Sequence, residues 1–197
     1  MDPIDPNSRH KGKFETEKWL INQKIPFTSF RPTYIYGPGN YNKIENGFFE
    51  RLFTKKSIPI PGDGSLITQL GHVSDLTDVM IRCMNYENSK NNIYNCSWEK
   101  GITIKWLIYL CAKVLGLNKN EISLKTFDFQ KLDPKSRKGF PIRLNHYQTD
   151  ISKIKRDLEC VPTFDLLNGL RDSFVKDFNN KKSEKFDENS DHILFNS

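Results

Sequence analysis

The chain has 197 residues, enough for one domain with a sizeable core or for a domain with a small extra lobe. Apolar residues make up 37% of it and aromatic residues 12%, a composition that excludes a fully disordered protein. No apolar run reaches the roughly 18 residues of a membrane helix, so we expect no membrane partner. The net charge of +6 fits an acidic partner such as RNA, and fits equally well a lysine-rich solubilising surface.

The first expected elements are a helix and a strand that ends in a glycine turn. Residues 13–22 have helical periodicity, with an apolar face formed by Phe14, Trp19, Leu20 and Ile21. Residues 25–36 are rich in β-prone side chains and predict one strand. Gly37-Pro38-Gly39 then predicts a turn, because no helix would tolerate this sequence.

The middle of the chain continues the alternation of helices and strands. Residues 44–56 predict an amphipathic helix, and residues 58–73 predict two short strands around a Gly-Asp-Gly turn. Asp75 is expected in the first turn of the next helix. The buried stripe of that helix is expected to consist of Leu76, Val79, Met80 and Cys83. A short strand is expected at residues 92–97.

The last third of the chain has clear helix signals around an irregular region. Thr103 is expected to cap a helix that Gly116 ends. The region 118–147 reads as irregular, with an edge strand within 121–129, and Asp150 is expected to cap a short helix to about residue 158. Residues 164–178 predict a final amphipathic helix. The alternation indicates the α/β class, with too few core strands for a complete doubly wound sheet.

The four cysteines indicate a reducing compartment. They form no C-x-x-C pair, and each lies in an apolar stretch of sequence. This pattern is typical of buried, reduced thiols in an intracellular or organellar protein. The cysteines are Cys83, Cys96, Cys111 and Cys160.

The order of several short motifs resembles the second half of an extended short-chain dehydrogenase of the NAD-dependent epimerase/dehydratase superfamily. The motifs are "GKFETE", "FRPTYIYGPGN", "IPIPGDGS", "GHVSDL" and "IYNCSWEKGIT". The resemblance implies an incomplete Rossmann-like parallel sheet plus a substrate-binding lobe over residues 1–178. A polar tail, expected to be mobile, would follow at residues 179–197. We therefore expect the chain to be part of a longer protein.

A closer resemblance is to the chloroplast stem-loop-binding proteins, which are plastid RNA-binding relatives of sugar-nucleotide epimerases. It rests on "DPNSRHKGKFETE", "RPTYIYGPGNYN", "ITQLGHVSDL" and the late "DHILF". This resemblance implies binding of stem-loop or messenger RNA, association with ribosomes or transcription complexes, and a plastid location. In some members it also implies a metal-dependent endoribonuclease activity, for which no residue can be carried over.

The dehydrogenase chemistry of the superfamily is not expected from this chain. Short-chain dehydrogenases use a Tyr-x-x-x-Lys helix, and Lys13 matches the lysine, which places Arg9 at the tyrosine position. A guanidinium stays protonated and cannot act as the base. The alternative register, with Lys18 as the lysine, puts Phe14 at the tyrosine position, again without a hydroxyl.

Cofactor and metal sites are expected to be vestigial or missing. The sequence contains no G-x-x-G-x-x-G phosphate loop, so we expect no cofactor for this chain and at most a relic NAD(P) site in its full-length parent. Its vestigial contacts would come from Lys13, Tyr34 and Gly37. No metal site is predicted, although a divalent ion would be needed for nuclease activity. Asp63, Asp128 and Asp133 could bind one only if folding brought them together.

The best candidates for RNA contacts are two basic clusters. Arginine and lysine suit phosphates, and interleaved aromatic rings such as Tyr147 can stack on exposed bases. A flexible charged loop around a buried Phe140 is the alternative interpretation of the larger cluster. The candidates are Lys131, Lys135, Arg137, Lys138, Phe140 and Arg143 in that cluster, and Arg9 and Lys11 in the smaller one.

Three functional hypotheses follow from these observations. The first is an RNA-binding protein on a catalytically degenerate epimerase-like scaffold. The second is the substrate-binding half of an NAD-dependent sugar-nucleotide epimerase or dehydratase. The third is a non-catalytic scaffold that forms homo-oligomers through an exposed edge of its parallel sheet.

Overall fold

A computed structural model describes residues 10–42, 44–180, 191 and 194–195 of the chain. The helices are α1 (Lys11–Asn22), α2 (Glu45–Phe53), α3 (Val73–Asn85), α4 (Ile104–Val114), α5 (Ser152–Leu158) and α6 (Leu166–Lys176). The strands are β1 (Thr28–Pro32), β2 (Tyr34–Tyr36), β3 (Ile58–Pro61), β4 (Ile67–Thr68), β5 (Leu70–His72), β6 (Asn92–Cys96), β7 (Ile102–Thr103) and β8 (Leu124–Phe127). Short 3₁₀ helices cover Glu87–Ser89, Lys119–Glu121, Ser136–Gly139 and Phe178–Asn180.

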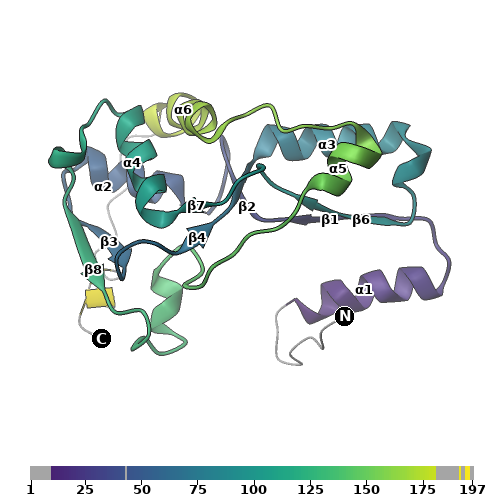
Figure 1. The fold of residues 1–197 in the computed structure, drawn as a ribbon, viewed down its shortest axis with the longest axis horizontal. Helices are drawn as coiled ribbons and strands as arrows, with labels where there is room; N and C mark the ends of the chain where they lie inside the picture. Colours follow the sequence, from purple (N-terminus) through teal and green to yellow (C-terminus); the bar gives the residue numbers. More distant parts are fainter. Residues whose placement is uncertain (1–9, 43, 181–190, 192–193, 196–197) are drawn as a thin grey trace.

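Most strand pairs are parallel. β1 pairs with β6, β2 with β5 and β3 with β8 in parallel, while only the short β4 and β7 pair antiparallel among the described strands. Figure 1 shows α3 and α5 on one face of the β1–β6 pair and α1 on the other. Parallel strands joined by helices are the hallmark of α/β proteins, so the predicted fold class is confirmed.

The single strand expected at residues 25–36 is in fact two strands with different partners. β1 ends at Pro32, and β2 begins at Tyr34 beside β5 rather than β6. Between them the N–H of Thr33 still donates to the carbonyl oxygen of Cys96, at 3.1 Å. The prediction was wrong here because an apolar run does not reveal that a strand changes its neighbour. The second strand expected within 58–73 is likewise divided, into β4 and β5.

The helix positions and the end signals of α4 are confirmed, whereas Asp150 lies one residue before the observed N-cap of α5, Ile151. Oγ1 of Thr103 accepts a hydrogen bond from the N–H of Trp106 at 3.2 Å, as an N-cap does. Gly116 follows α4 with a φ of 76°, the left-handed conformation in which helices commonly end. Asp150 accepts a hydrogen bond from the N–H of Ser152 at 3.0 Å, where α5 begins.

The core consists of two clusters of buried side chains. The larger one lies among α2, α4, α6 and the β3–β8 pair, and includes Phe49, Ile58 and Leu107. The smaller one joins β6 to α3 and α5, and contains three of the four cysteines. All four cysteines are buried and free, which confirms the sequence expectation.

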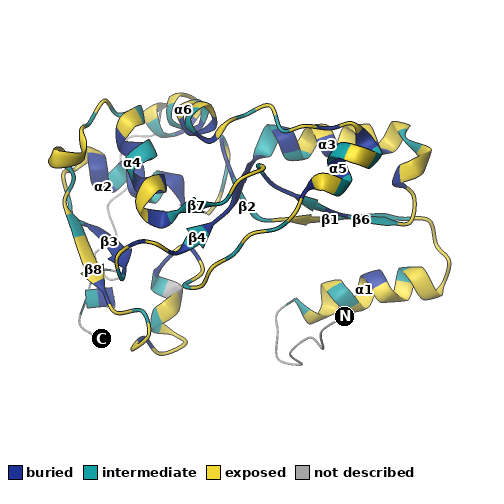
Figure 2. Cartoon of the chain, viewed as in Figure 1, coloured by how far each residue is buried: buried dark blue, intermediate teal, exposed yellow. Residues whose placement is uncertain are grey.

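Two predicted apolar faces are more exposed than expected. In α1, Trp19 is 54% and Ile21 55% exposed, and Glu17 is the buried residue of the helix. Figure 2 shows α1 largely in the colour of exposed residues. In α3, Met80 is 41% exposed although the pattern placed it in the buried stripe. Helical periodicity identifies an apolar face but not whether a neighbour covers it.

The C-terminal residues that the structure describes contact the body of the molecule. The carboxylate of Asp191 accepts hydrogen bonds from the guanidinium of Arg51, at 2.9 and 2.5 Å. Leu194 is 2% exposed within the larger core cluster. The remainder of the predicted tail lies outside the described residues, so the boundary after residue 178 stays a prediction. None of the described helices has the length and hydrophobicity that a membrane span needs.

Candidate ligand-binding cleft

An open cleft of about 480 Å³ lies beside the carboxyl ends of β1 and β2. Its walls come from the start of α1, from residues 32–35, from residues 38–42 and from two side chains of the loop before α5. Ligands of open α/β sheets characteristically bind outside the carboxyl ends of the strands. The cleft is therefore the candidate functional site.

One wall of the cleft is a cluster of aromatic rings and a guanidinium. The guanidinium carbon of Arg143 lies 4.6 Å from the ring centroid of Tyr147. The rings of Tyr34 and Tyr147 meet edge to face, with centroids 6.4 Å apart. Oη of Tyr34 also accepts a hydrogen bond from the backbone N–H of Arg143, at 2.8 Å. β2 and the distant loop are thus tied together at this wall.

The start of α1 contributes basic side chains to another part of the cleft lining. His10 and Lys13 both line the cleft, and Lys13 is exposed. The predicted family lysine is therefore at the cleft. Lys11, predicted as an RNA contact, instead lies 3.8 Å from Glu15 in an exposed ion pair one turn along the helix. Arg9 lies outside the described residues.

A half-buried ion pair holds α1 against β1. Both carboxylate oxygens of Glu17 accept hydrogen bonds from the guanidinium of Arg31, and Ser29 donates to Oε1 at 2.6 Å. Burial alone would raise the pKa of Glu17, but these hydrogen bonds from Arg31 and Ser29 outweigh it and hold the pKa below its ordinary value. The carboxylate therefore stays ionised, and the pair fixes the helix that carries Lys13.

Gly37 does not line the cleft, but it contacts the interior next to the cleft residues Pro38 and Gly39. Its N–H donates to Oε1 of the buried Glu45 at 2.9 Å. Nδ1 of His72, the N-cap residue of α3, accepts a hydrogen bond from the N–H of Ser74 at 3.3 Å. Pro38 and Gly39 line the cleft instead. The N–H of Gly37 is thus engaged within the fold, and the cofactor contact expected there stays a prediction.

Among the members of the larger predicted basic cluster whose side chains the structure describes, only Arg143 reaches the cleft. Lys131, Lys135 and Arg137 are exposed on the preceding loop, where Lys131 lies 3.4 Å from Asp128. Phe140 is 4% exposed and packs against Phe127 at a centroid distance of 5.5 Å. Its ring is therefore not available for stacking on a base, because the core already covers it. The side chain of Lys138 is outside the described part of the structure.

The three carboxylates considered for a metal ion each stabilise a local turn. Asp63, Asp128 and Asp133 accept hydrogen bonds from backbone N–H groups two residues further on, at 2.9, 3.1 and 2.7 Å. Within the described residues, no group of three or more histidine, cysteine or carboxylate side chains could hold a metal ion. We therefore assign no metal ligands.

The cleft does not by itself fit a dinucleotide. Lys13 and Tyr34 are in place, but the sequence holds no glycine-rich loop to take the pyrophosphate. The N–H of Gly37 is already bonded to Glu45. We therefore derive no redox step from this chain.

Comparison with known proteins identifies the relatives of the chain. Residues 3–97 match the NAD dependent epimerase/dehydratase family. Over 180 residues, 90% of its length, the chain is 44% identical to the chloroplast stem-loop binding protein of 41 kDa b of Arabidopsis thaliana. The chain is a relative of the chloroplast stem-loop-binding proteins. The predicted resemblance is thus confirmed, although the chain spans only 46% of that relative's length.

Solved structures of low sequence identity confirm the type of fold. The chain is similar to a dTDP-glucose 4,6-dehydratase from Bacillus anthracis, solved with NAD, at a TM-score of 0.70 and 18% identity, covering 90% of this chain and 54% of that one. It is equally similar to a UDP-glucose 4-epimerase from Thermotoga maritima, with a TM-score of 0.70, 21% identity, and 90% and 55% coverage. These similarities concern the fold alone.

Sequence reasoning missed the contact between β2 and the loop before α5, and the residues of the turn after β2. The hydrogen bond from Arg143 to Tyr34 joins residues 109 positions apart, so no local pattern could reveal it. Asn40, Tyr41 and Asn42 also line the cleft. Their only signal was the run "GPGNYN" itself, in which three polar or aromatic residues follow a glycine turn.

Proposed function

We propose that this chain binds stem-loop RNA on an epimerase-like scaffold. The observation that carries the proposal is the cleft, which joins the Arg143–Tyr147–Tyr34 cluster to the basic start of α1. Proteins bind structured RNA through phosphate contacts from basic side chains and through stacking of unpaired bases on aromatic rings and guanidinium planes. The name of the Arabidopsis relative, a stem-loop binding protein, supports the same partner.

The exposed basic loop supports the proposal as a second region of contact. Lys131, Lys135 and Arg137 lie on the segment between β8 and Phe140, which Figure 1 places on the same lower side of the molecule as α1. Charges there can hold RNA phosphates without reading bases. A plastid location and association with ribosomes or transcription complexes belong to this same proposal. Endoribonuclease activity is part of the expectation, with no residue assigned to it.

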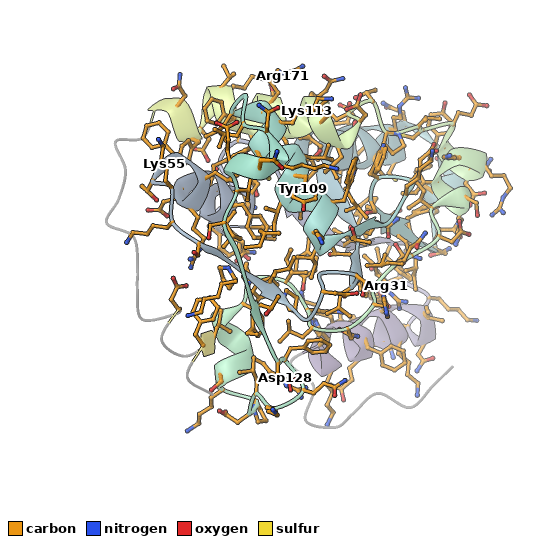
Figure 3. All side chains as sticks on the ribbon, turned by 60° about the vertical axis from the view of Figure 1, so that its left-hand side comes forward. Arg31, Lys55, Tyr109, Lys113, Asp128 and Arg171 are labelled. Carbon is orange, nitrogen blue, oxygen red and sulfur yellow. The ribbon has the colours of Figure 1, made fainter. Side chains whose placement is uncertain are left out.

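The test is the anisotropy of a labelled stem-loop RNA titrated with this chain at several salt concentrations. We expect a binding constant that falls steeply with salt, because each neutralised phosphate releases counterions. Lys135→Ala and Arg137→Ala should each weaken binding and reduce the logarithmic salt slope by about 1. Lys113→Ala is the matched control, since Lys113 projects from α4 on the side opposite to Asp128 and the basic loop (Figure 3).

Two outcomes would change the proposal. No binding at low salt by a chain with a folded circular-dichroism spectrum would contradict it. If Lys113→Ala and Arg137→Ala weaken RNA binding equally, the affinity depends only on the net charge of the chain, and the loop is not the binding site. A parallel titration with Mg²⁺ checks for RNA fragments, whose appearance only with the metal would add nuclease activity.

A second candidate function is the substrate half of an NAD-dependent epimerase or dehydratase. It is favoured by Lys13, which lies in the cleft at the place of the family lysine. Calorimetric titration with NAD and with a nucleotide sugar tests it. Binding of either ligand by this chain, lost in Lys13→Ala, would favour this candidate over RNA binding.

A further inference from the structure

The cleft has the size and the walls of a site for one nucleotide. We propose that it holds a single unpaired nucleotide of the RNA, with its base against the Arg143–Tyr147 pair and its phosphate at the start of α1. This inference rests on the proposed function. It specifies that the cleft recognises an unpaired nucleotide of the RNA. The chain would then distinguish a loop or bulge from a continuous stem.

The volume of the cleft suits one nucleotide whose base is unpaired. At about 480 Å³, it lies within the range of roughly 300–1,000 Å³ over which proteins bind small molecules. A base inside an RNA helix is stacked on both faces, and its pairing edge is hidden. It can enter such a cleft only after it leaves the helix, whereas a loop base is already unstacked.

The aromatic wall is preorganised for stacking. Arg143 is exposed and lies over the ring of Tyr147, and its backbone is fixed by the hydrogen bond to Oη of Tyr34. Tyr41, which is 91% exposed, adds another ring to the cleft lining. Side chains that are already held in place lose little freedom when a ligand binds, so stacking on them is favoured.

The turn after β2 supplies amide groups beside the rings. Asn40 holds the turn, because its amide donates to the carbonyl of Ile35 at 2.9 Å and its Oδ1 accepts from the N–H of Asn42 at 3.0 Å. The side chain of Asn42 lines the cleft. An amide offers one acceptor and two donor hydrogens, which match the edge of an unpaired base.

The other wall suits the phosphate of the same nucleotide. His10 is the N-cap of α1, and Lys13 lies in its first turn, which contains no acidic residue. The positive end of the helix dipole and a lysine charge therefore face one side of the cleft. The rings and amides face the other sides. A nucleotide has this same division into an anionic group and a planar base.

The experiment compares three RNAs with the same fluorescent label: a hairpin, the hairpin with one abasic loop position, and a blunt duplex of equal length. We expect removal of the loop base to weaken binding about 5- to 150-fold, the range of base–aromatic stacking. In Tyr147→Ala this difference should disappear, because the variant no longer supports the stacked base. Tyr109→Ala, a half-buried tyrosine of α4 on another part of the surface (Figure 3), should retain it.

A second readout locates the base directly. The fluorescence of 2-aminopurine at the same loop position should change on binding to the wild type and to Tyr109→Ala, but not to Tyr147→Ala. If duplex and hairpin bind equally and the 2-aminopurine signal stays constant, the inference is overturned while RNA binding stands. If none of the RNAs binds, both the inference and the proposed function are overturned.

Discussion

Gly37 occupies the position where β2 turns into the wall of the cleft. Its φ of 118° lies in a region that L-residues rarely adopt, and a Cβ atom there would be 2.9 Å from Nε2 of His72. The N–H of Gly37 donates a hydrogen bond to the carboxylate of the buried Glu45. Because residues 38–42 follow directly, the shape of the cleft depends on this one backbone conformation.

Gly37→Ala should lower the free energy of unfolding by about 1–3 kcal/mol, through the disfavoured φ and the contact with His72. Urea denaturation followed by circular dichroism measures the loss. Gly39→Ala is the control, since Gly39 has a φ of 80° but open space where its Cβ would lie. An equal loss in both variants would mean that the contact with His72 contributes nothing.

Because of His72, we expect the free energy of unfolding to decrease as the pH falls. Its imidazole stacks on Phe164 at a centroid distance of 3.9 Å, and burial holds its pKa below the ordinary value despite the opposing charges of Asp172 and Asp75. In the unfolded chain the same group takes up a proton below a pH of about 6.5. As the pH falls through that value, the unfolded state binds more protons than the folded state, and stability decreases.

The free energy of unfolding of His72→Asn should therefore change less than that of the wild type between pH 7 and pH values below 6. Asparagine retains an acceptor for the N–H of Ser74, so the helix keeps its cap. Burial raises the pKa of Glu45, which works in the opposite direction, but both proteins share that group. Parallel pH profiles would contradict a neutral, buried His72.

At the scale of elements, the C-terminal segment ties α2 to the β3–β8 pair. Arg51 of α2 binds the carboxylate of Asp191 and donates to the carbonyl of Ser57 at 3.0 Å. Nζ of Lys125 in β8 lies 3.9 Å from the ring centroid of Phe195. Leu194 fills the core between these contacts. The described residues of the late "DHILF" motif thus have a packing role in this fold.

Leu194→Ala should destabilise the chain by about 2–5 kcal/mol, the usual range for a buried leucine whose loss leaves a cavity. Thermal and urea unfolding both measure this change. Val175→Ala, in a residue of α6 that is 54% exposed, should change stability by less than about 0.5 kcal/mol. A loss below about 1 kcal/mol in Leu194→Ala would show that the segment is dispensable for the fold.

At the scale of the whole molecule, apolar side chains of α1 and the loop after it are exposed beside the β1–β6 pair. Trp19, Ile21 and Ile25 are 54%, 55% and 40% exposed there. Within the described residues, β1 pairs with one strand only. Parallel sheets are normally covered on both faces, and an unpaired edge invites pairing with another chain. These features favour self-association, the basis of the scaffold hypothesis.

Sedimentation velocity at increasing protein concentration should therefore show species larger than a monomer. A double variant, Trp19→Lys with Ile21→Lys, should shift the equilibrium toward the monomer, because two charges would be buried in the contact. Met84→Lys is the control, since Met84 is 77% exposed on α3, across the sheet from α1. A wild-type chain that stays monomeric at every concentration would contradict self-association.

The features that the sequence predicted correctly depend on neighbours within a few positions. The cap at Thr103 and the stop at Gly116 each follow from a short local pattern, as does the order of helices and strands. Lys13 and Arg143 were also identified as candidate site residues, because charge and motif spacing are visible in the sequence.

By itself, the sequence determined the α/β class, the helix ends and the relationship to the stem-loop-binding proteins. Only the tertiary structure decided which strand β2 joins, that Phe140 is buried against Phe127, and that Arg143 reaches Tyr34. The physical reason is the separation along the chain of the residues that interact. Periodicity and capping act over one or two helical turns, whereas strand partners and cleft walls depend on contacts between residues far apart in the chain.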